Sequence, residues 1–182
     1  MTTFHPLKVS KIERITKDAV VISFEVPFHL KSSYSFISGQ YISLEAEING
    51  VHVRRSYSLC STPEQSVLSV GVKEVPKGIF SSYINQLLRV GDTLNISSPE
   101  GRFFYDSKNE NHSILAITAG SGITPVFSIL NSFLTNNKFG VFTLIYGNKT
   151  PEKTMFYKEL KALEKKYPKQ VKIFWVFSQS NE

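Results

Sequence analysis

The chain has 182 residues and a formal net charge of +6, with 41% apolar and 20% charged residues. This composition supports a packed core and excludes a disordered chain. A single cysteine, Cys60, excludes an internal disulfide and an iron–sulfur cluster within the chain, since a cluster needs about four cysteine ligands. No apolar run reaches the ~20 residues that cross a membrane. Residues 1–6 carry no signal-peptide pattern, so we expect a cytoplasmic protein outside the membrane.

Short strands separated by turns are predicted along the first part of the chain. They are rich in β-branched and aromatic residues, and Asn49-Gly50 and Gly91-Asp92 are turn signals between them. One helix is predicted at residues 81–88, where apolar residues share one side. Regular short strands of this kind predict a closed antiparallel barrel with one helix. The predicted strands are residues 20–26, 41–46, 51–53, 67–72 and 93–97.

The pattern changes after a polar segment at residues 106–112, which we predict to be a linker. Beyond it, short apolar strands alternate with helices, which predicts a parallel sheet covered on both faces. The overall fold class is therefore β + α/β, with a barrel at residues 1–108 and a partial parallel α/β domain at residues 109–182. The predicted strands of the second domain are residues 114–118, 141–146 and 171–177, and its helices are residues 124–134 and 152–166.

The predicted parallel sheet is incomplete. A doubly wound dinucleotide domain has two βαβαβ halves, and only one precedes Glu182. One strand edge therefore has no partner within the chain, although natural proteins normally cover such edges. We expect a truncated chain or a proteolytic fragment. The alternative is a partner chain that completes the sheet.

A glycine-rich turn at residues 118–125 (Thr-Ala-Gly-Ser-Gly-Ile-Thr-Pro) lies between the first strand and helix of this sheet. Gly120 and Gly122 allow a sharp turn and a close approach to a phosphate. The helix start offers free N–H groups and a positive dipole end, and Pro125 suits the first turn because it lacks an N–H. The third glycine of the standard dinucleotide fingerprint is absent. A plain strand-to-helix connection is therefore the alternative interpretation.

The run Arg54-Arg55-Ser56-Tyr57-Ser58 ends a predicted barrel strand. Arg55 can form a forked contact with a phosphate, and the Tyr57 ring can pack on a planar ring system. The Ser58 hydroxyl can donate to a ring nitrogen. The alternative is a surface arginine beside a barrel tyrosine.

The run Lys77-Gly78-Ile79-Phe80-Ser81 starts the predicted barrel helix. Gly78 exposes bare N–H donors, and Ser81 adds a hydroxyl, so the pair predicts a second anion site. Ordinary N-capping by Ser81 is the alternative.

Together these runs resemble the ferredoxin–NADP reductase-like superfamily over nearly the whole chain. The matching marks are Arg-x-Tyr-Ser at residues 55–58, Gly-x-x-Ser at residues 78–81, the turn at residues 120–125, and Tyr146-Gly147-Asn148. Residues 4–7 and 54–60 are most similar to flavin reductase components of the phenylacetate-degradation and ring-hydroxylating oxygenase type. Full-length members of that group add a plant-type [2Fe–2S] domain. The resemblance implies an FAD-binding barrel followed by the N-terminal half of an NAD(P)-binding domain.

The resemblance also implies residue roles. Arg55 would hold the FAD pyrophosphate, Tyr57 would pack on the flavin, and Ser58 would hydrogen-bond near flavin N5 as the catalytic candidate. A second pyrophosphate contact at Gly78, Phe80 and Ser81 favours FAD over FMN, which has one phosphate. The complete set of implied cofactor-binding residues is Arg55, Ser56, Tyr57, Ser58, Gly71, Val72, Lys73, Gly78, Ile79, Phe80, Ser81, Gly120, Ser121, Gly122, Ile123, Thr124 and Pro125.

Within this set, Gly71, Val72 and Lys73 would contribute backbone contacts alongside the flavin. Thr124 would approach the flavin, and the glycines of the turn would lie against the nicotinamide cofactor.

The implied reaction is hydride transfer from NADH or NADPH to flavin N5. Single electrons would then pass to a ferredoxin-like [2Fe–2S] domain or protein. NADP-using relatives often carry Ser-Arg after the third parallel strand, whereas this chain has Ser178-Gln179, which favours NADH. A late Cys-Gly pair and a C-terminal segment beside the flavin, both usual in the family, are absent. A misplacement of ~1 Å can cost roughly a hundredfold in rate, so a flavin-binding fragment without turnover is the alternative function.

Charge gives a third hypothesis, a basic barrel that binds single-stranded nucleic acid. The basic residues are dispersed except for Lys161, Lys165 and Lys166, and no basic patch with aromatic platforms is visible, so no nucleic-acid partner is expected. The four histidines lack metal-ligand spacing, and no metal is expected. Cys60 is expected to be a small buried residue rather than a redox group.

Overall fold

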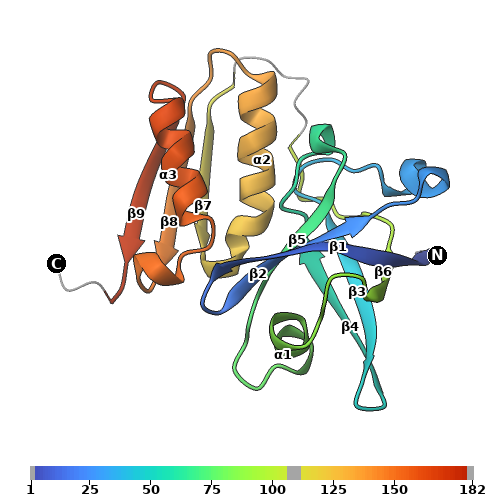
Figure 1. The fold of residues 1–182 in the computed structure, drawn as a ribbon. Coiled ribbons are helices and arrows are strands. Elements are labelled where there is room, and N and C mark those ends of the chain that lie inside the picture. Colours follow the sequence, from blue (N-terminus) through green and yellow to red (C-terminus); the bar gives the residue numbers. More distant parts are fainter. Residues whose placement is uncertain (1–2, 106–111, 180–182) are drawn as a thin grey trace.

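The computed structural model describes residues 3–105 and 112–179 (Figure 1). The linker predicted at residues 106–112 lies outside the described residues apart from His112, and so does the predicted boundary between residues 108 and 109. We call residues 3–105 the barrel and residues 112–179 the α/β part.

The barrel is a six-stranded antiparallel sheet curled around one core. The strand order is β4-β3-β6-β1-β2-β5. The edge strands β4 and β5 meet at one isolated bridge, between Leu59 and Val70. Next to this bridge, Cys60 N–H donates to Ser69 O at 2.9 Å. The predicted closed barrel is therefore a curled half-barrel whose edges meet only here among the described residues, and the short helix η2 (Pro63–Gln65) lies between the two edges along the chain. The strands are β1 (Phe4–Thr16), β2 (Ala19–Glu25), β3 (Tyr41–Ile48), β4 (Val51–Ser58), β5 (Leu68–Lys73) and β6 (Thr93–Ser97).

Side chains that alternate along these strands fill the barrel interior. Leu7, Val9, Ile22, Leu44 and Ile96 come from four different strands and are all buried in one cluster. The helix α1 (Ile79–Gln86) packs against this cluster and covers one end of it. It begins and ends two residues before the predicted helix at residues 81–88.

The sequence pattern does not predict two elements of the barrel, β1 and the 3-10 helix η1 (Phe28–Tyr34). β1 is 13 residues long and carries charged side chains at several exposed positions, which hide its apolar alternation. The helix η1 follows β2 and buries Tyr34, whose O–H donates to Ile96 O at 2.7 Å.

The α/β part contains a parallel sheet of β7 (Ile114–Ala119), β8 (Phe142–Asn148) and β9 (Val171–Phe177), in that order. The helices α2 (Ile123–Asn136) and α3 (Tyr157–Lys166) both lie on one face of it (Figure 1). Right-handed crossovers that advance in one direction place their helices on the same face. The prediction of a sheet covered on both faces is therefore wrong, although the predicted fold class is confirmed. The uncovered face presents Leu115, Ile117, Phe174 and Val176, which are 64%, 71%, 58% and 52% exposed.

The helix predicted at residues 152–166 is two separate elements. A 3-10 turn, η4 (Pro151–Lys153), precedes α3, and Phe156 lies between them in the left-handed conformation with φ 59°. The Phe156 ring stacks on Phe127 of α2, with centroids 4.3 Å apart and planes 5° apart. A left-handed backbone is costly for a non-glycine residue, so tertiary packing of the ring overrides the helical pattern here.

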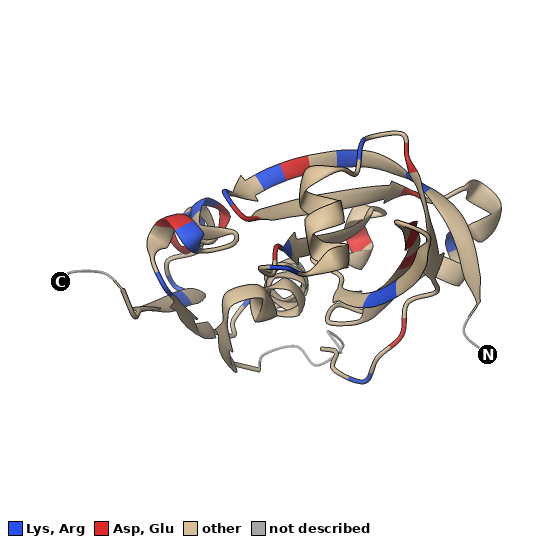
Figure 2. Ribbon diagram, turned by 90° about the horizontal axis from the view of Figure 1, so that it is seen from below, with Lys and Arg blue, Asp and Glu red and all other residues tan. Residues whose placement is uncertain are grey.

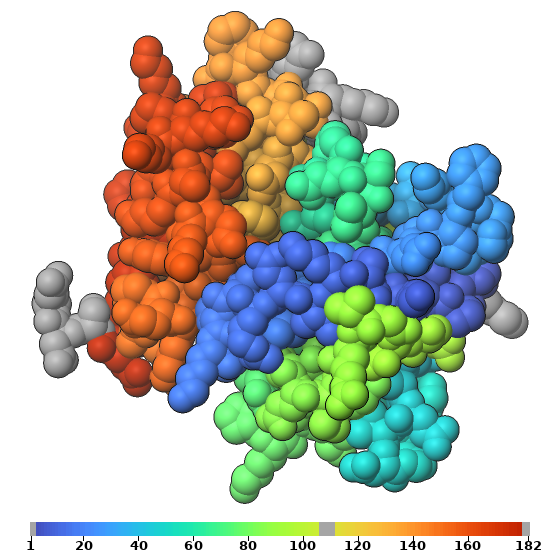
Figure 3. Space-filling view, in the orientation of Figure 1, coloured from blue at the N-terminus to red at the C-terminus, as the bar shows by residue number. Residues whose placement is uncertain are grey.

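The barrel and the α/β part share a core. Ala19 and Cys60 of the barrel are buried in the same cluster as Ile123, Met155 and Phe156. Burial raises the pKa of the Cys60 thiol to about 12, so the thiol is neutral at physiological pH, as expected for a small buried residue. The space-filling view shows the two parts packed directly against each other (Figure 3).

Candidate functional site

One cleft lies between the barrel and the α/β part. The end of β4, the segment from β5 to α1, and the glycine-rich turn before α2 line a cavity of about 520 Å³, which we call the central cleft. A volume in this range is typical of a small-molecule site. The lining residues are Arg55, Ser56, Tyr57, Ser58, Gly71, Lys73, Val75, Gly78, Ile79, Phe80, Ser81, Ser121, Gly122, Thr124 and Pro125.

All but three of the predicted cofactor-binding residues line the central cleft. The exceptions are Val72 and Ile123, whose side chains are 0% exposed in the cores, and Gly120, which lines a neighbouring cleft. Val75 also lines the central cleft and is 59% exposed, but it belongs to no glycine or hydroxyl motif. Only its position three residues before Gly78 could have indicated it.

Tyr57 packs against the barrel helix at the wall of the cleft. Its ring stacks on Phe80, with centroids 6.1 Å apart and an interplanar angle of 30°. Burial raises the pKa of Tyr57 to about 12, although the charge of Arg55 acts in the opposite direction. The phenol therefore stays neutral at physiological pH and offers an apolar ring together with an O–H group.

The adjacent arginines have different surroundings. The Arg54 guanidinium lies 4.6 Å from the Phe4 ring centroid, and its Nε is 4.0 Å from Glu45 Oε1. Arg55 lines the central cleft, where its Nη1 donates to Arg54 O at 2.7 Å. A guanidinium has five N–H donors, so this single bond leaves Arg55 with donors for an anion in the cleft.

The start of α1 forms a second polar corner. Gly78 is the N-cap residue, and Ser81 lies inside the first turn, where its Oγ accepts from Val75 N–H at 3.1 Å. The alternative of N-capping by Ser81 is therefore wrong, because the hydroxyl fixes the preceding loop instead. A Cβ on Gly78 would lie 2.6 Å from Ser81 Oγ, so the close packing of the loop requires glycine. The first N–H groups of a helix have no partner within it, and its positive end favours an anion.

The two glycines of the glycine-rich turn are required for different reasons. Gly120 has φ 54°, a left-handed conformation that glycine adopts without strain. A Cβ on Gly122 would lie 2.7 Å from Thr118 Oγ1, so here the close approach of the turn to β7 excludes a side chain. Thr124 Oγ1 donates to Ser121 O at 3.1 Å and closes the turn onto the start of α2.

β5 presents alternate side chains to the two parts. Val72 points into the barrel core, while Gly71 lies against Thr124 of the α/β part. Lys73 Nζ crosses to donate to Lys153 O at 2.8 Å and lies 3.7 Å from Asp18 Oδ2. The resemblance implies only backbone contacts at Lys73, and nothing in the strand pattern indicates this bridging side chain.

A second cavity of about 880 Å³ follows the carboxyl ends of the parallel strands, and we call it the edge cleft. Lys73 lines both clefts, so they adjoin. The buried Tyr146 donates its O–H to Gly120 O at 2.9 Å, which fixes the glycine-rich turn from β8, and burial raises the pKa of this phenol. Ligands of open α/β sheets bind at the carboxyl ends of the strands. The edge cleft is lined by Asp18, Lys73, Glu74, Pro76, Ala119, Gly120, Gly147, Asn148, Lys149, Lys153, Val176 and Ser178.

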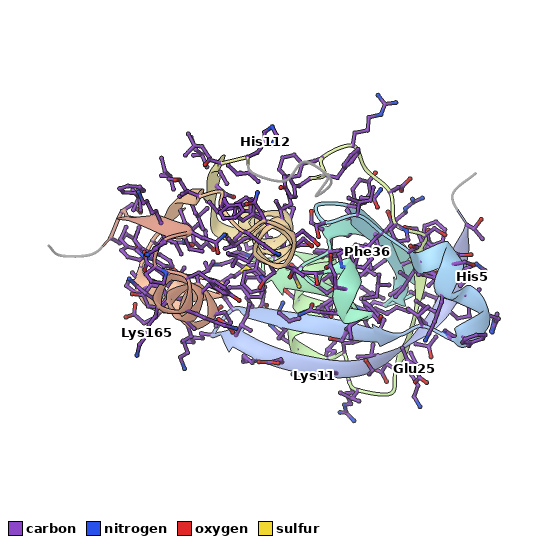
Figure 4. The ribbon with its side chains drawn as sticks, turned by 90° about the horizontal axis from the view of Figure 1, so that it is seen from above. His5, Lys11, Glu25, Phe36, His112 and Lys165 are labelled. Carbon is purple, nitrogen blue, oxygen red and sulfur yellow. The ribbon has the colours of Figure 1, made fainter. Side chains whose placement is uncertain are left out.

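Charged residues are distributed over both parts of the molecule (Figure 2). Lys11 of β1 and Lys165 of α3 lie on the outside (Figure 4), and Lys161 Nζ is 3.3 Å from Glu164 Oε2. Across residues 3–105 and 112–179, no group of three His, Cys, Asp or Glu side chains could hold a metal ion. No helix within these ranges is long and apolar enough to cross a membrane.

Comparison with known families identifies the chain. The family described as "Oxidoreductase FAD-binding domain" matches residues 6–105, and the family described as "Oxidoreductase NAD-binding domain" matches residues 116–182. The first match covers more than half of the sequence. The chain therefore belongs to the family of oxidoreductase FAD-binding domains.

Individual relatives agree with this assignment. The chain is 43% identical over 180 residues to a component of the 1,2-phenylacetyl-CoA epoxidase of Escherichia coli, covering 98% of this chain and 51% of the relative. It is 36% identical over 169 residues to the ferredoxin reductase component of 3-ketosteroid-9-alpha-monooxygenase of Rhodococcus rhodochrous, covering 92% and 47%. The chain thus spans about half the length of these relatives.

A solved structure supports the fold. The ferredoxin-NADP+ reductase from Plasmodium falciparum with 2'P-AMP superimposes with a TM-score of 0.83 at 21% identity, covering 98% of this chain and 75% of the other. This superposition confirms the expected fold. The two family matches and the relatives above confirm the resemblance to FAD- and NAD-binding oxidoreductases of the ferredoxin–NADP reductase-like type.

Proposed function

We propose that this chain is an NAD(P)H-dependent flavin oxidoreductase that passes electrons from a nicotinamide nucleotide through FAD to an iron–sulfur acceptor. The observation that carries the proposal is the junction of the central cleft with the edge cleft at Lys73. The central cleft offers ring and phosphate contacts, and the edge cleft lies where α/β sheets bind nucleotides. A flavin in the first cleft and a nicotinamide reaching from the second would meet at the glycine-rich turn.

Residues of the barrel would hold FAD. Arg55 would form charge-assisted hydrogen bonds with the pyrophosphate, and the start of α1 at Gly78 would supply a second anion contact. Two phosphate contacts favour FAD over FMN. Tyr57 would offer its ring to the flavin, since stacking on Phe80 holds it in place at the cleft wall.

The flavin, when bound, supplies hydride acceptance and the release of electrons one at a time. Ser58 is the proposed catalytic residue, because its hydroxyl would donate a hydrogen bond near flavin N5. Thr124 and the turn at Ser121 and Gly122 would bring the nicotinamide against the flavin and exclude water from between them. The other cofactor-binding residues predicted from the sequence belong to the same proposal.

We propose NADH as the preferred electron donor. Ser178 lines the edge cleft, and the following residue, Gln179, has no charge to bind a 2′-phosphate. Lys149 and Lys153 line the same cleft and can contact the nucleotide pyrophosphate. The ratio of kcat/KM for NADH to that for NADPH is expected to exceed one, and a ratio below one would overturn this choice.

The division of the chain and its partner are also part of the proposal. Residues 1–108 would form the FAD-binding domain and residues 109–182 the N-terminal half of the NAD(P)-binding domain, which the family matches at residues 6–105 and 116–182 support. One relative is named as the ferredoxin reductase component of a monooxygenase, which supports a ferredoxin-like [2Fe–2S] domain or protein as the acceptor. The proposal includes a cytoplasmic location and no nucleic-acid or membrane partner.

The first experiment is the visible absorption spectrum of the purified chain after incubation with FAD and desalting. Retained flavin absorbance that NADH bleaches under anaerobic conditions supports the proposal. Retained absorbance that neither NADH nor NADPH bleaches selects the alternative, a flavin-binding fragment without turnover. A folded, colourless protein overturns the assignment of FAD to the central cleft.

A further inference from the structure

A polar seam joins the barrel to α2 away from the central cleft. Ser128, Ser132 and Asn136 follow one another at intervals of four residues and therefore share one face of α2. Ser128 Oγ donates to Ser61 O of the barrel at 2.6 Å. The barrel members of the seam are Ser38, Ser61 and Glu64.

Glu64 is the charged member of the seam. Its Oε2 accepts from Ser132 Oγ at 3.3 Å, and its Oε1 accepts from Asn136 Nδ2 at 3.2 Å. Ser132 also shares a hydrogen bond of 2.6 Å with the hydroxyl of Ser38. Both carboxylate oxygens of a barrel residue are thus bonded to two successive turns of α2.

The serine hydroxyls of the seam are buried, whereas Glu64 lies at its exposed edge. Ser38, Ser128 and Ser132 are only 2%, 0% and 4% exposed. A buried hydroxyl without a partner costs about 1–3 kcal/mol, so a shift of α2 along the barrel would break several bonds at once. Fully bonded polar networks of this kind define one packing arrangement, whereas an apolar contact tolerates sliding.

The turn that carries Glu64 is closed by its own hydrogen bonds. Thr62 N–H donates to Gln65 Oε1 at 3.0 Å within a capping box, and Ser66 ends the turn in the left-handed conformation. Burial alone would raise the pKa of Glu64, but hydrogen bonds from its own backbone, Thr62, Asn136 and Ser132 lower it below its usual value. The carboxylate is therefore ionised at neutral pH and only accepts hydrogen bonds.

The Glu64 contacts and the central cleft lie toward opposite ends of α2. Thr124, in the first turn, lines the cleft, and Asn136 ends the helix. Twelve residues separate them, which is about 18 Å at 1.5 Å per residue. A change in tilt at the Glu64 end would therefore move the glycine-rich turn relative to the flavin.

We propose that Glu64 is a positioning residue that fixes the tilt of α2 and so holds the glycine-rich turn at reacting distance from the flavin. The kinetic part of this inference rests on the proposed function. The proposed FAD contacts lie mainly on the barrel, at Arg55, Tyr57 and Gly78. Loss of Glu64 should consequently slow reduction of the flavin and leave its retention nearly unchanged.

The test compares Glu64→Ala with Glu64→Gln. Alanine removes both acceptors, whereas glutamine keeps one amide oxygen and gains a donor for the Ser132 hydroxyl. Flavin reduction is followed by anaerobic stopped flow at saturating NADH. We expect Glu64→Ala to slow it by roughly tenfold to a hundredfold, as a small misplacement does, and Glu64→Gln to recover most of the rate. Glu47→Ala, on the exposed β3–β4 hairpin, is the matched control and should behave like the wild type.

Hydrogen exchange gives a readout that does not depend on activity. In Glu64→Ala, the amides of α2 should exchange faster while those of β1 and β2 stay unchanged. Equal α2 exchange and an equal reduction rate in Glu64→Ala and wild type would overturn the positioning role. If Glu64→Ala fails to fold, Ser132→Ala and Asn136→Ala each remove one contact and give the same comparison. A wild-type chain that binds FAD but is not reduced contradicts the proposed function, and α2 exchange then decides on the seam alone.

Discussion

Gly71 of β5 and Thr124 of α2 are in contact across the boundary between the barrel and the α/β part. A Cβ added to Gly71 would lie 2.8 Å from Thr124 Cγ2 and 3.0 Å from Met155 Cε. The Met155 methyl is the flexible end of its side chain and can move, but the Thr124 methyl is attached directly to its Cβ. Gly71 therefore determines how closely the barrel approaches the start of α2.

This contact predicts a coupled pair of substitutions. Gly71→Ala is expected to lower the free energy of unfolding by about 1–3 kcal/mol, because overpacking forces the neighbouring groups apart. Thr124→Ser removes the methyl but keeps the hydroxyl that donates to Ser121 O. Urea unfolding should show that the double variant regains part of the free energy of unfolding that Gly71→Ala loses. Strictly additive changes would show that the two residues are not coupled.

The neighbouring arginines give a prediction about FAD binding. Arg55→Ala should weaken FAD binding by about tenfold to a hundredfold, since a hydrogen bond to a charged group contributes about 1.5–3 kcal/mol. Arg54→Ala is the control, because the Arg54 side chain is engaged with Phe4 and Glu45. Titration of flavin fluorescence measures both affinities. Equal weakening in the two variants would point to general surface charge and against a phosphate contact at Arg55.

The two faces of the parallel sheet should differ in their sensitivity to truncation. Leu144 of β8 is 0% exposed beneath the helices, whereas Leu115 of β7 is 64% exposed on the uncovered face. Leu144→Ala is expected to lower the free energy of unfolding by about 2–5 kcal/mol. Leu115→Ala should change it by less than about 0.5 kcal/mol. Chemical denaturation of the 182-residue chain checks both, and a large loss in Leu115→Ala would mean that the face is covered in solution.

Tyr57 should make stability depend on alkaline pH. Its pKa is raised from 10.0 to about 12, mainly by burial, so the folded chain binds the phenolic proton more tightly than the unfolded chain does. The stabilisation is complete below about pH 10 and is lost as pH rises from about 10 to about 12. In that window the free energy of unfolding of Tyr57→Phe should fall less steeply than that of the wild type. Identical slopes would show that the Tyr57 phenol ionises normally in the folded chain.

Local sequence patterns predict the elements whose own residues show the alternation or apolar run typical of a strand. Residues 93–97 alternate and residues 171–177 are apolar except for Lys172, and β6 and β9 have these bounds. β1 was missed because its outward positions are charged, and α3 starts later than predicted because Phe156 stacks on Phe127. The uncovered sheet face was not predictable either, since it depends on the direction of two crossovers.

The candidate site likewise combines features that local sequence patterns predict with features that they do not. Glycine and hydroxyl motifs indicated three segments that the structure brings to one cleft, because each motif reflects local backbone geometry. Val75, the bridging side chain of Lys73 and the carboxylate of Glu64 carry no such signal. Their positions depend on how the barrel docks on α2, which is a property of the whole chain.

Cys60 is the single cysteine of the sequence, and it lies buried where the barrel and the α/β part share a core. A thiol reagent needs access to the sulfur and needs the thiol in its thiolate form. Burial of Cys60 blocks access and raises the pKa of its thiol to about 12, so that little thiolate is present at neutral pH. Modification of the native chain therefore requires a transient opening of this region. The rate of labelling becomes a measure of how often the two parts separate. The sequence thus contains its own chemical reporter of opening between the barrel and the α/β part, which can be read without introducing any probe residue.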